Sequence, residues 1–184
     1  MSRKITKRDF VHIRPTEEQK ELARVMSENV PKNIRNSIKK GEGRHHGSMG
    51  ELLGAGLIGA TISNTKDYDL IMPNGITIDV KTGICNSVPQ LNYAVNVAAF
   101  NINQMCDYYL FFRIKEDFSD AWMLGALSKK EYFRIAVKRD FKQRDPNDTH
   151  GVGFDFKATC YNLLISSLKP ITYKQLKSEQ NAQA

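Results

Sequence analysis

No apolar run in the 184-residue sequence is long enough to span a membrane, and cysteine is scarce. A spanning helix needs about 20 mostly apolar residues, and the polar opening MSRKITKRDF lacks the apolar core of a signal peptide. The three cysteines, Cys85, Cys106 and Cys160, are odd in number and far apart, which predicts neither a disulfide framework nor a zinc site. We therefore expect an intracellular, cytoplasmic protein with reduced thiols and no membrane partner.

The charge of the chain favours a polyanionic partner. Lysine and arginine total 27 against 20 acidic residues, a formal net charge of +7, in a chain whose 41% hydrophobic and 26% charged content is that of a globular domain. Charge alone does not separate DNA, RNA and an anionic membrane surface. Because no long basic amphipathic face supports membrane binding, nucleic acid is the expected partner.

The segment DYDLIMPNGITIDVKT, residues 67–82, has the pattern of a β-hairpin. Two apolar runs flank Pro73, Asn74 and Gly75, where proline presets φ and glycine accepts the left-handed conformation of a short loop. This turn predicts four facing pairs: Met72 with Ile76, Leu70 with Ile78, Asp69 with Asp79, and Asp67 with Lys81.

Alternation along the two strands separates an apolar face from a polar one. The apolar face carries Tyr68, Leu70, Met72, Ile76, Ile78 and Val80; the other carries Asp67, Asp69, Ile71, Thr77, Asp79 and Lys81. Opposed Cβ atoms lie about 4.5–5.5 Å apart, so facing aspartates repel each other unless a cation compensates. Carboxylate oxygens suit Mg²⁺, which predicts a metal site, although a hairpin with a merely hydrated polar face is the simpler alternative.

The arrangement of Asp69 followed by Asp79-Val80-Lys81 after a short hairpin resembles the PD-(D/E)XK nuclease superfamily. The resemblance covers about residues 48–115, and one departure is Tyr68 in the place of the proline before the first aspartate. It implies an α/β fold with a restriction-endonuclease-like αβββαβ core, a central mixed sheet flanked by helices. Junction resolvases, restriction-type enzymes and phage-encoded nucleases are the members with a similarly small single domain, and many of them act as homodimers.

The resemblance also assigns roles to individual residues. Asp69 and Asp79 would bind Mg²⁺, with Mn²⁺ able to substitute, and the Val80 carbonyl would be a third ligand. Glu51 would complete the site or recruit a second ion, Lys81 would hold the attacking water or stabilise charge on the phosphate, and Gln104 would orient water or phosphate. Two alternatives stay open: Glu51 completes a helix capping box with Ser48, and Asn101 replaces Gln104.

The chain divides into three expected parts: a basic N-terminal helical arm at 1–47, a nuclease-like domain at 48–173 and a disordered polar tail at 174–184. In the arm, Thr16 and Gln19 form a capping box for a helix over 16–29. A basic cluster then follows, either a phosphate-binding surface or a solvated helix face; it comprises Lys32, Arg35, Lys39, Lys40 and Arg44. The adjacent His45 and His46 are expected in a loop and lack the spacing of a metal pair.

After the hairpin, the pattern predicts strands over 91–97, 107–114 and 121–127, a short helix over 98–106, and a capped helix from Ser128 to about 137. The function expected from these features is a Mg²⁺-dependent endonuclease that hydrolyses phosphodiester bonds, with DNA favoured as substrate. Two alternatives remain: a non-catalytic nucleic-acid-binding or assembly protein on the same fold, and an RNA-processing nuclease.

Overall fold

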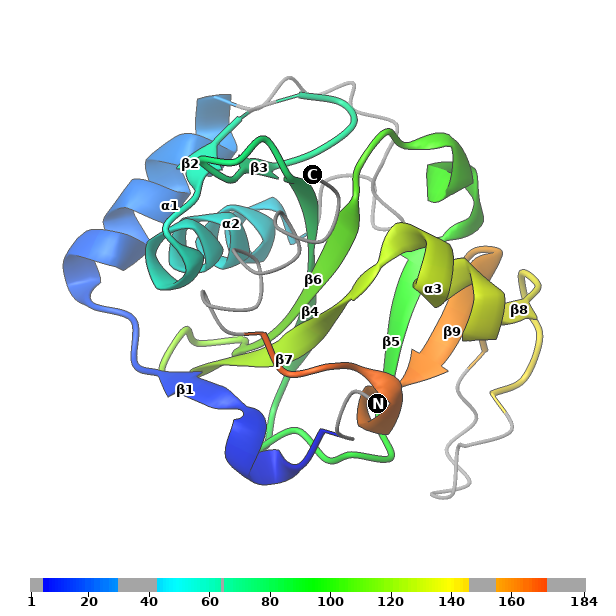
Figure 1. The fold of residues 1–184 in the computed structure, drawn as a ribbon. Coiled ribbons are helices and arrows are strands. Elements are labelled where there is room, and N and C mark those ends of the chain that lie inside the picture. Colours follow the sequence, from blue (N-terminus) through cyan, green and yellow to red (C-terminus); the bar gives the residue numbers. More distant parts are fainter. Residues whose placement is uncertain (1–4, 30–42, 64, 146–154, 172–184) are drawn as a thin grey trace.

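The computed structural model describes residues 5–29, 43–63, 65–145 and 155–171, which form two β-sheets with helices packed against them (Figure 1). The larger sheet is mixed, in the order β1-β7-β6-β4-β3-β2, and the smaller has the order β5-β9-β8. The strands of the larger sheet are β1 (Val11–Ile13), β2 (Thr61–Ile62), β3 (Leu70–Ile71), β4 (Thr77–Cys85), β6 (Tyr108–Lys115) and β7 (Ala121–Ser128); those of the smaller are β5 (Ala94–Ala98), β8 (Val137–Arg139) and β9 (Cys160–Leu164). The helices are α1 (Glu17–Asn29), α2 (Arg44–Ile58) and α3 (Lys129–Ile135), with short 3₁₀ turns η1 (Lys7–Asp9), η2 (Ala99–Asn103) and η3 (Ile165–Ser167).

The centre of the larger sheet is the parallel pair β4 and β6, which is in register from Ile78 opposite Tyr108 to Cys85 opposite Lys115. Parallel neighbours need a crossover connection, and here the chain passes through β5 and η2 before it returns as β6. The β6 residues Leu110, Phe111 and Phe112 are at most 1% exposed. This agrees with the continuous apolar run that predicts a strand buried on both faces.

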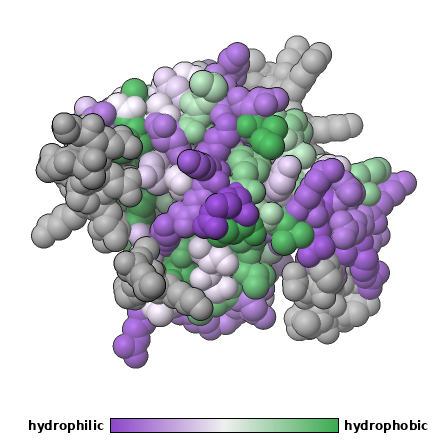
Figure 2. Space-filling model, turned by 45° about the vertical axis from the view of Figure 1, so that its right-hand side comes forward, coloured by the Kyte–Doolittle hydropathy of each residue, from purple (hydrophilic) through white to green (hydrophobic). Residues whose placement is uncertain are grey.

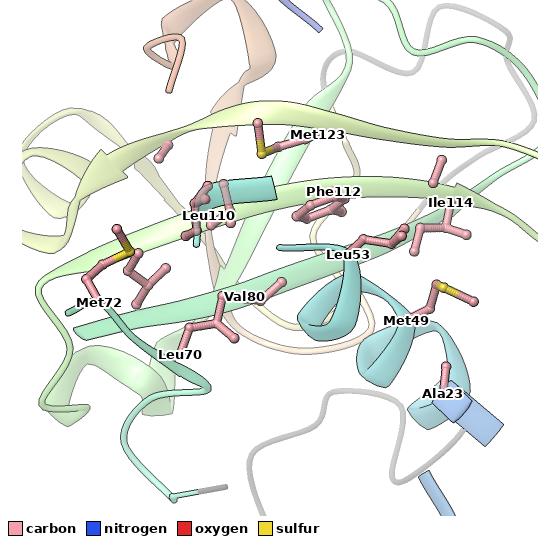
Figure 3. Packing of buried hydrophobic residues seen from close by; sticks show 14 residues of the cluster. Ala23, Met49, Leu53, Leu70, Met72, Val80, Leu110, Phe112, Ile114 and Met123 are labelled. Carbon is pink, nitrogen blue, oxygen red and sulfur yellow. The ribbon is translucent and has the colours of Figure 1, made fainter. Parts of the chain in front are cut away.

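Two hydrophobic clusters cover the two faces of this sheet. On one face, α2 packs Met49 and Leu53 against Leu70, Val80 and Phe112, and α1 packs behind α2 (Figures 1 and 3). On the other face, side chains from the smaller sheet and α3 meet the larger sheet, in a cluster that includes Val95, Tyr109, Phe111, Leu127 and Tyr132. The predicted α/β class with a mixed sheet flanked by helices is therefore confirmed in this general form.

The hairpin has the predicted turn and the first part of the predicted register. Gly75 has a left-handed φ of 85°, Leu70 pairs with Ile78, and the Met72 amide donates to the Ile76 carbonyl at 2.8 Å. The ladder then ends, so the predicted Asp69–Asp79 and Asp67–Lys81 strand pairs do not form. The Asp69 amide still donates to the Ile78 carbonyl at 3.0 Å, and the Asp69 carboxylate accepts the Val80 amide at 2.7 Å.

Helix α1 begins with its predicted capping box. The Thr16 amide donates to the Gln19 side-chain carbonyl at 2.9 Å, and the Gln19 amide donates to the Thr16 hydroxyl at 3.2 Å. The reciprocal bonds satisfy two of the amides that a helix N-terminus leaves open.

Helix α2 begins at Arg44, four residues before the predicted start at Ser48, so the predicted Ser48–Glu51 capping box is wrong. Gly43 provides the N-cap with a left-handed φ of 92°. His45 and His46 lie in the helix, not in a loop; their rings pack against Phe118. The expected domain boundary after residue 47 falls inside α2.

The crossover between β4 and β6 differs from the prediction in two ways: its strand joins the smaller sheet, and it contains a short 3₁₀ turn in place of a helix. The strand expected over 91–97 is β5, which pairs with β9 in the smaller sheet, and the helix expected over 98–106 is only the 3₁₀ turn η2. Ser128 does cap α3 by accepting the Glu131 amide at 3.2 Å, and α3 ends at Ile135.

The expected tail at 174–184 lies outside the described residues. Within the part of the chain that is described, no helix is both long and apolar enough to cross a membrane. Figure 2 shows hydrophilic and hydrophobic residues interspersed over one face of the molecule.

Candidate active site at strand β4

Asp79 and Lys81 lie together on the face of β4 opposite α2. Val80 between them packs toward α2, and strand alternation turns its two neighbours to the other side. The Lys81 ammonium lies 2.5 Å from Asp79 Oδ2 and 5.7 Å from the centre of the Tyr109 ring. Asp79 is only 3% exposed, whereas Lys81 is partly buried, so the ion pair joins a buried carboxylate to an ammonium that reaches toward solvent.

Gln104 reaches the same carboxylate from the crossover. Its side-chain amide donates to Asp79 Oδ1 at 2.8 Å, and the glutamine is 7% exposed. The predicted site residue Gln104 therefore does contact the hairpin. Asn101, its alternative, is also buried, and its backbone carbonyl accepts the Tyr109 hydroxyl at 3.3 Å.

Asp69 approaches the site from the other strand of the hairpin. Burial raises the pKa of its carboxyl well above the ordinary value, and the negative charges of Asp79 and Glu51 add to that rise. Lys81 and the hydrogen bond from the Val80 amide act in the opposite direction on the same pKa. The carboxylate is thus close enough to the other acids to feel their charge.

Glu51 reaches this group of charges because α2 lies very close to β4. A Cβ atom on the preceding residue, Gly50, would be 2.1 Å from the Thr82 hydroxyl oxygen, so only glycine permits the approach. Burial raises the pKa of Glu51 to about 7; Asp79 adds to the rise, and Lys81 opposes it. Glu51 from α2 therefore lies near three residues of the hairpin, Asp69, Asp79 and Lys81.

The chemistry of these donors fits a hard divalent cation. Carboxylate oxygens are the ligands that Mg²⁺ prefers. Burial is the main cause of the raised pKa values of Glu51 and Asp69, and the repulsion from Asp79 that adds to both is what a bound cation would offset. Among the described residues, however, no three His, Cys, Asp or Glu side chains lie close enough together to hold one ion. Lys81 holds Asp79 Oδ2, so an ion at that oxygen would have to displace the ammonium.

The predicted phosphate-binding cluster is only partly placed. Lys32, Arg35, Lys39 and Lys40 lie outside the described residues, and Arg44 is the first residue of α2. The two histidines that follow it have structural partners, because one ring nitrogen of His45 lies 3.1 Å from the Lys20 carbonyl and one of His46 lies 3.3 Å from the Lys115 carbonyl.

Two neighbours of the site are not predicted from the sequence. Tyr109 lies beside Asp79 in the β4–β6 register, which the alternation of the two strands could have indicated once they were paired. The Lys129 ammonium donates to the Gln104 backbone carbonyl, a contact between α3 and the crossover for which the sequence carries no local signal.

A comparison of the chain with protein-family models found no match, and a comparison with curated protein sequences found none either. The chemistry of the residues around Asp79 is therefore the basis on which a function can be proposed.

Proposed function

We propose that the protein is a Mg²⁺-dependent endonuclease of the PD-(D/E)XK kind, with DNA favoured over RNA as its substrate. The observation that carries the proposal is the ion pair of buried Asp79 and partly buried Lys81 on one face of β4. The charge of Asp79 also raises the pKa of both Asp69 and Glu51. The net charge of +7 of the whole chain suits a polyanionic substrate. On this proposal the larger sheet is a restriction-endonuclease-like core, and the smaller sheet is an addition formed by β5 of the crossover and by β8 and β9 after α3.

Each residue of the site then has a defined task. The ion would be held by the carboxylates of Asp69, Asp79 and Glu51 and by the Val80 carbonyl. When bound, it would act as a Lewis acid on the phosphoryl oxygen and lower the pKa of a coordinated water. Lys81, once released from Asp79, would donate hydrogen bonds to the attacking water or to a phosphate oxygen and stabilise the charge that develops there. Gln104 keeps Asp79 Oδ1 oriented by its hydrogen bond.

The test is a cleavage assay on a panel of substrates. Supercoiled plasmid, linear duplex, single strands, a four-way junction and structured RNA are each incubated with Mg²⁺, Mn²⁺ or EDTA. We expect metal-dependent cutting that falls by a factor of about 10³ or more in Asp79→Ala and Asp79→Asn, because the buried ligand is removed. Asp140→Ala is the matched control, because Asp140 is exposed, lies outside the site and forms an ion pair with Lys138, as Asp79 does with Lys81.

Retained cutting in both Asp79 variants would refute the site assignment. The substrate that is cut fastest would decide between DNA and RNA. Light scattering on the same preparations would test the homodimer that cutting of two strands implies.

The main alternative is a non-catalytic nucleic-acid-binding or assembly protein on the same fold. The direct Lys81–Asp79 ion pair favours it, because a permanent internal counter-ion would make a metal unnecessary. Binding without cutting on every substrate and with every ion would support this alternative.

A further inference from the structure

Lys129 connects α3 to the end of the crossover. Its ammonium donates to the Gln104 carbonyl, and its backbone amide donates to the Asp107 carbonyl at 2.8 Å. These bonds attach the first residue of α3 to the segment just after η2, at two carbonyls that lie on either side of Met105 and Cys106.

The side chain of Gln104 has little else to fix its direction. Within the described residues its amide nitrogen contacts Asp79, while its Oε1 atom is buried without a hydrogen-bond partner. A glutamine has several rotatable bonds, and holding it in one rotamer is entropically unfavourable. The position of its backbone therefore decides whether the amide reaches Asp79, and that backbone is held by the bond from the Gln104 amide to the Asn101 carbonyl, at 3.0 Å, and by Lys129.

Lys129 is also close to the charges of the site. Burial raises the pKa of the Cys106 thiol to about 12; the charge of Asp79 adds to the rise, and those of Lys81 and Lys129 oppose it. No ion pair formed by the described part of the chain includes Lys129, although the residue is half-buried. Partial burial of an ammonium is unfavourable unless it is hydrogen-bonded, and the Gln104 carbonyl provides that bond.

We propose that Lys129 is a positioning residue: it holds the Gln104 backbone so that the glutamine amide donates to Asp79 Oδ1. The contact itself is independent of any ligand. Its effect on catalysis depends on the proposed nuclease function, because Asp79 is a metal ligand only in that case.

The experiment compares Lys129→Met with Lys130→Met, which removes the same charge from the exposed neighbouring position. The first measurement is made on the full chain without metal or nucleic acid: exchange of the Gln104 side-chain NH₂ protons with solvent, followed by ¹⁵N NMR and assigned with Gln104→Ala. We expect exchange about tenfold faster in Lys129→Met, because the amide is released from a buried acceptor, and no change in Lys130→Met. Lys129→Arg should restore protection, since it keeps a charged donor.

The second measurement is cleavage by a double-mutant cycle. If Lys129 acts through Gln104, Lys129→Met lowers kcat about tenfold with KM unchanged in the wild-type background and has no further effect in Gln104→Ala. Melting curves check that each variant folds. If Lys129→Met does not fold, Lys129→Gln replaces it, because the glutamine side chain is too short to reach the Gln104 carbonyl in the same way.

Unchanged Gln104 exchange in Lys129→Met would overturn the proposal. So would equal losses of activity with and without Gln104, which would indicate that Lys129 contacts the substrate directly. If the wild-type protein cuts no substrate, the nuclease proposal fails, while the exchange measurement still decides whether Lys129 positions Gln104.

Discussion

Glu51 is a residue whose proton binding makes stability depend on pH. Its pKa is raised to about 7 by burial, with a contribution from Asp79, whereas the ordinary value in an unfolded chain is 4.5. The folded protein therefore binds a proton at Glu51 more tightly than the unfolded chain does. The resulting stabilisation is fully present below about pH 4.5 and is lost as the pH rises through about 7.

We expect the free energy of unfolding of the metal-free protein to fall between pH 5 and pH 8, and Glu51→Gln to remove much of that fall. At pH 8 the variant should be more stable than the wild type by on the order of 1–3 kcal/mol. Urea titrations at several pH values measure this, and Glu18→Gln, at an exposed α1 position, is the control. Some slope should remain, because the pKa of Asp69 is raised in the same direction. An identical pH profile for Glu51→Gln and the wild type would contradict the burial of a proton at this site.

At the scale of elements, the close packing of α2 on β4 depends on one glycine. Gly50 has no space for a side chain beside Thr82, whereas a Cβ atom at Gly56, on the same helix, would have no neighbour within 4 Å. Gly50→Ala should therefore lower the free energy of unfolding by about 1–2 kcal/mol, because the cost of overpacking against Thr82 exceeds the gain in helix propensity. Gly56→Ala should stabilise it by about 0.5–1 kcal/mol through propensity alone.

Chemical denaturation of the two variants measures this difference. Thr82→Ala removes the oxygen that the new methyl group would meet, so it should restore part of the stability that Gly50→Ala removes. Equal free energies of unfolding for Gly50→Ala and Gly56→Ala would show that α2 can move away from β4 without cost, and that Glu51 is not held near Asp79 by this contact.

Local chemistry explains which elements can be predicted from the sequence. The turn residues Pro73 and Gly75 specify the hairpin, and Thr16 with Gln19 specifies the start of α1, because every partner lies within a few residues. The start of α2 has no such signal. It depends on the left-handed Gly43 and on ring contacts of the histidines with Phe118, about 70 residues away.

The same distinction applies to the site. Asp69, Asp79 and Lys81 belong to one hairpin, so their pattern is visible in the sequence. The contact of Gln104 with Asp79 could be anticipated only from the resemblance to a family. Lys129 could not be found at all, because its bond to Gln104 depends on how α3 packs against the crossover, and β5 joins β9 for an equally long-range reason.

At the scale of the whole molecule, the excess of 27 basic over 20 acidic residues predicts how binding to nucleic acid responds to salt. Each phosphate contact releases counterions, so the logarithm of the association constant should fall linearly with the logarithm of salt concentration. If the basic cluster after Pro31 is the main phosphate-binding surface, its charges should account for most of that slope. The cluster comprises Lys32, Arg35, Lys39, Lys40 and Arg44.

We replace all five cluster residues with glutamine and measure the association constant for duplex DNA in EDTA, from about 50 to 200 mM salt. The steepness of its logarithm against the logarithm of salt concentration should fall by about 0.9 for each phosphate that the variant no longer neutralises. The matched control removes the same charge from exposed positions elsewhere, namely Arg8, Arg14, Lys138, Lys142 and Lys157. If the cluster is the specific binding surface, the salt dependence of binding should be much weaker in the cluster variant than in the control. If the slope falls by the same amount in both variants, affinity follows net charge alone, and the cluster is a solvated surface and not the binding site. Because EDTA removes any metal contribution, this result would stand whether or not Asp79 supports cleavage.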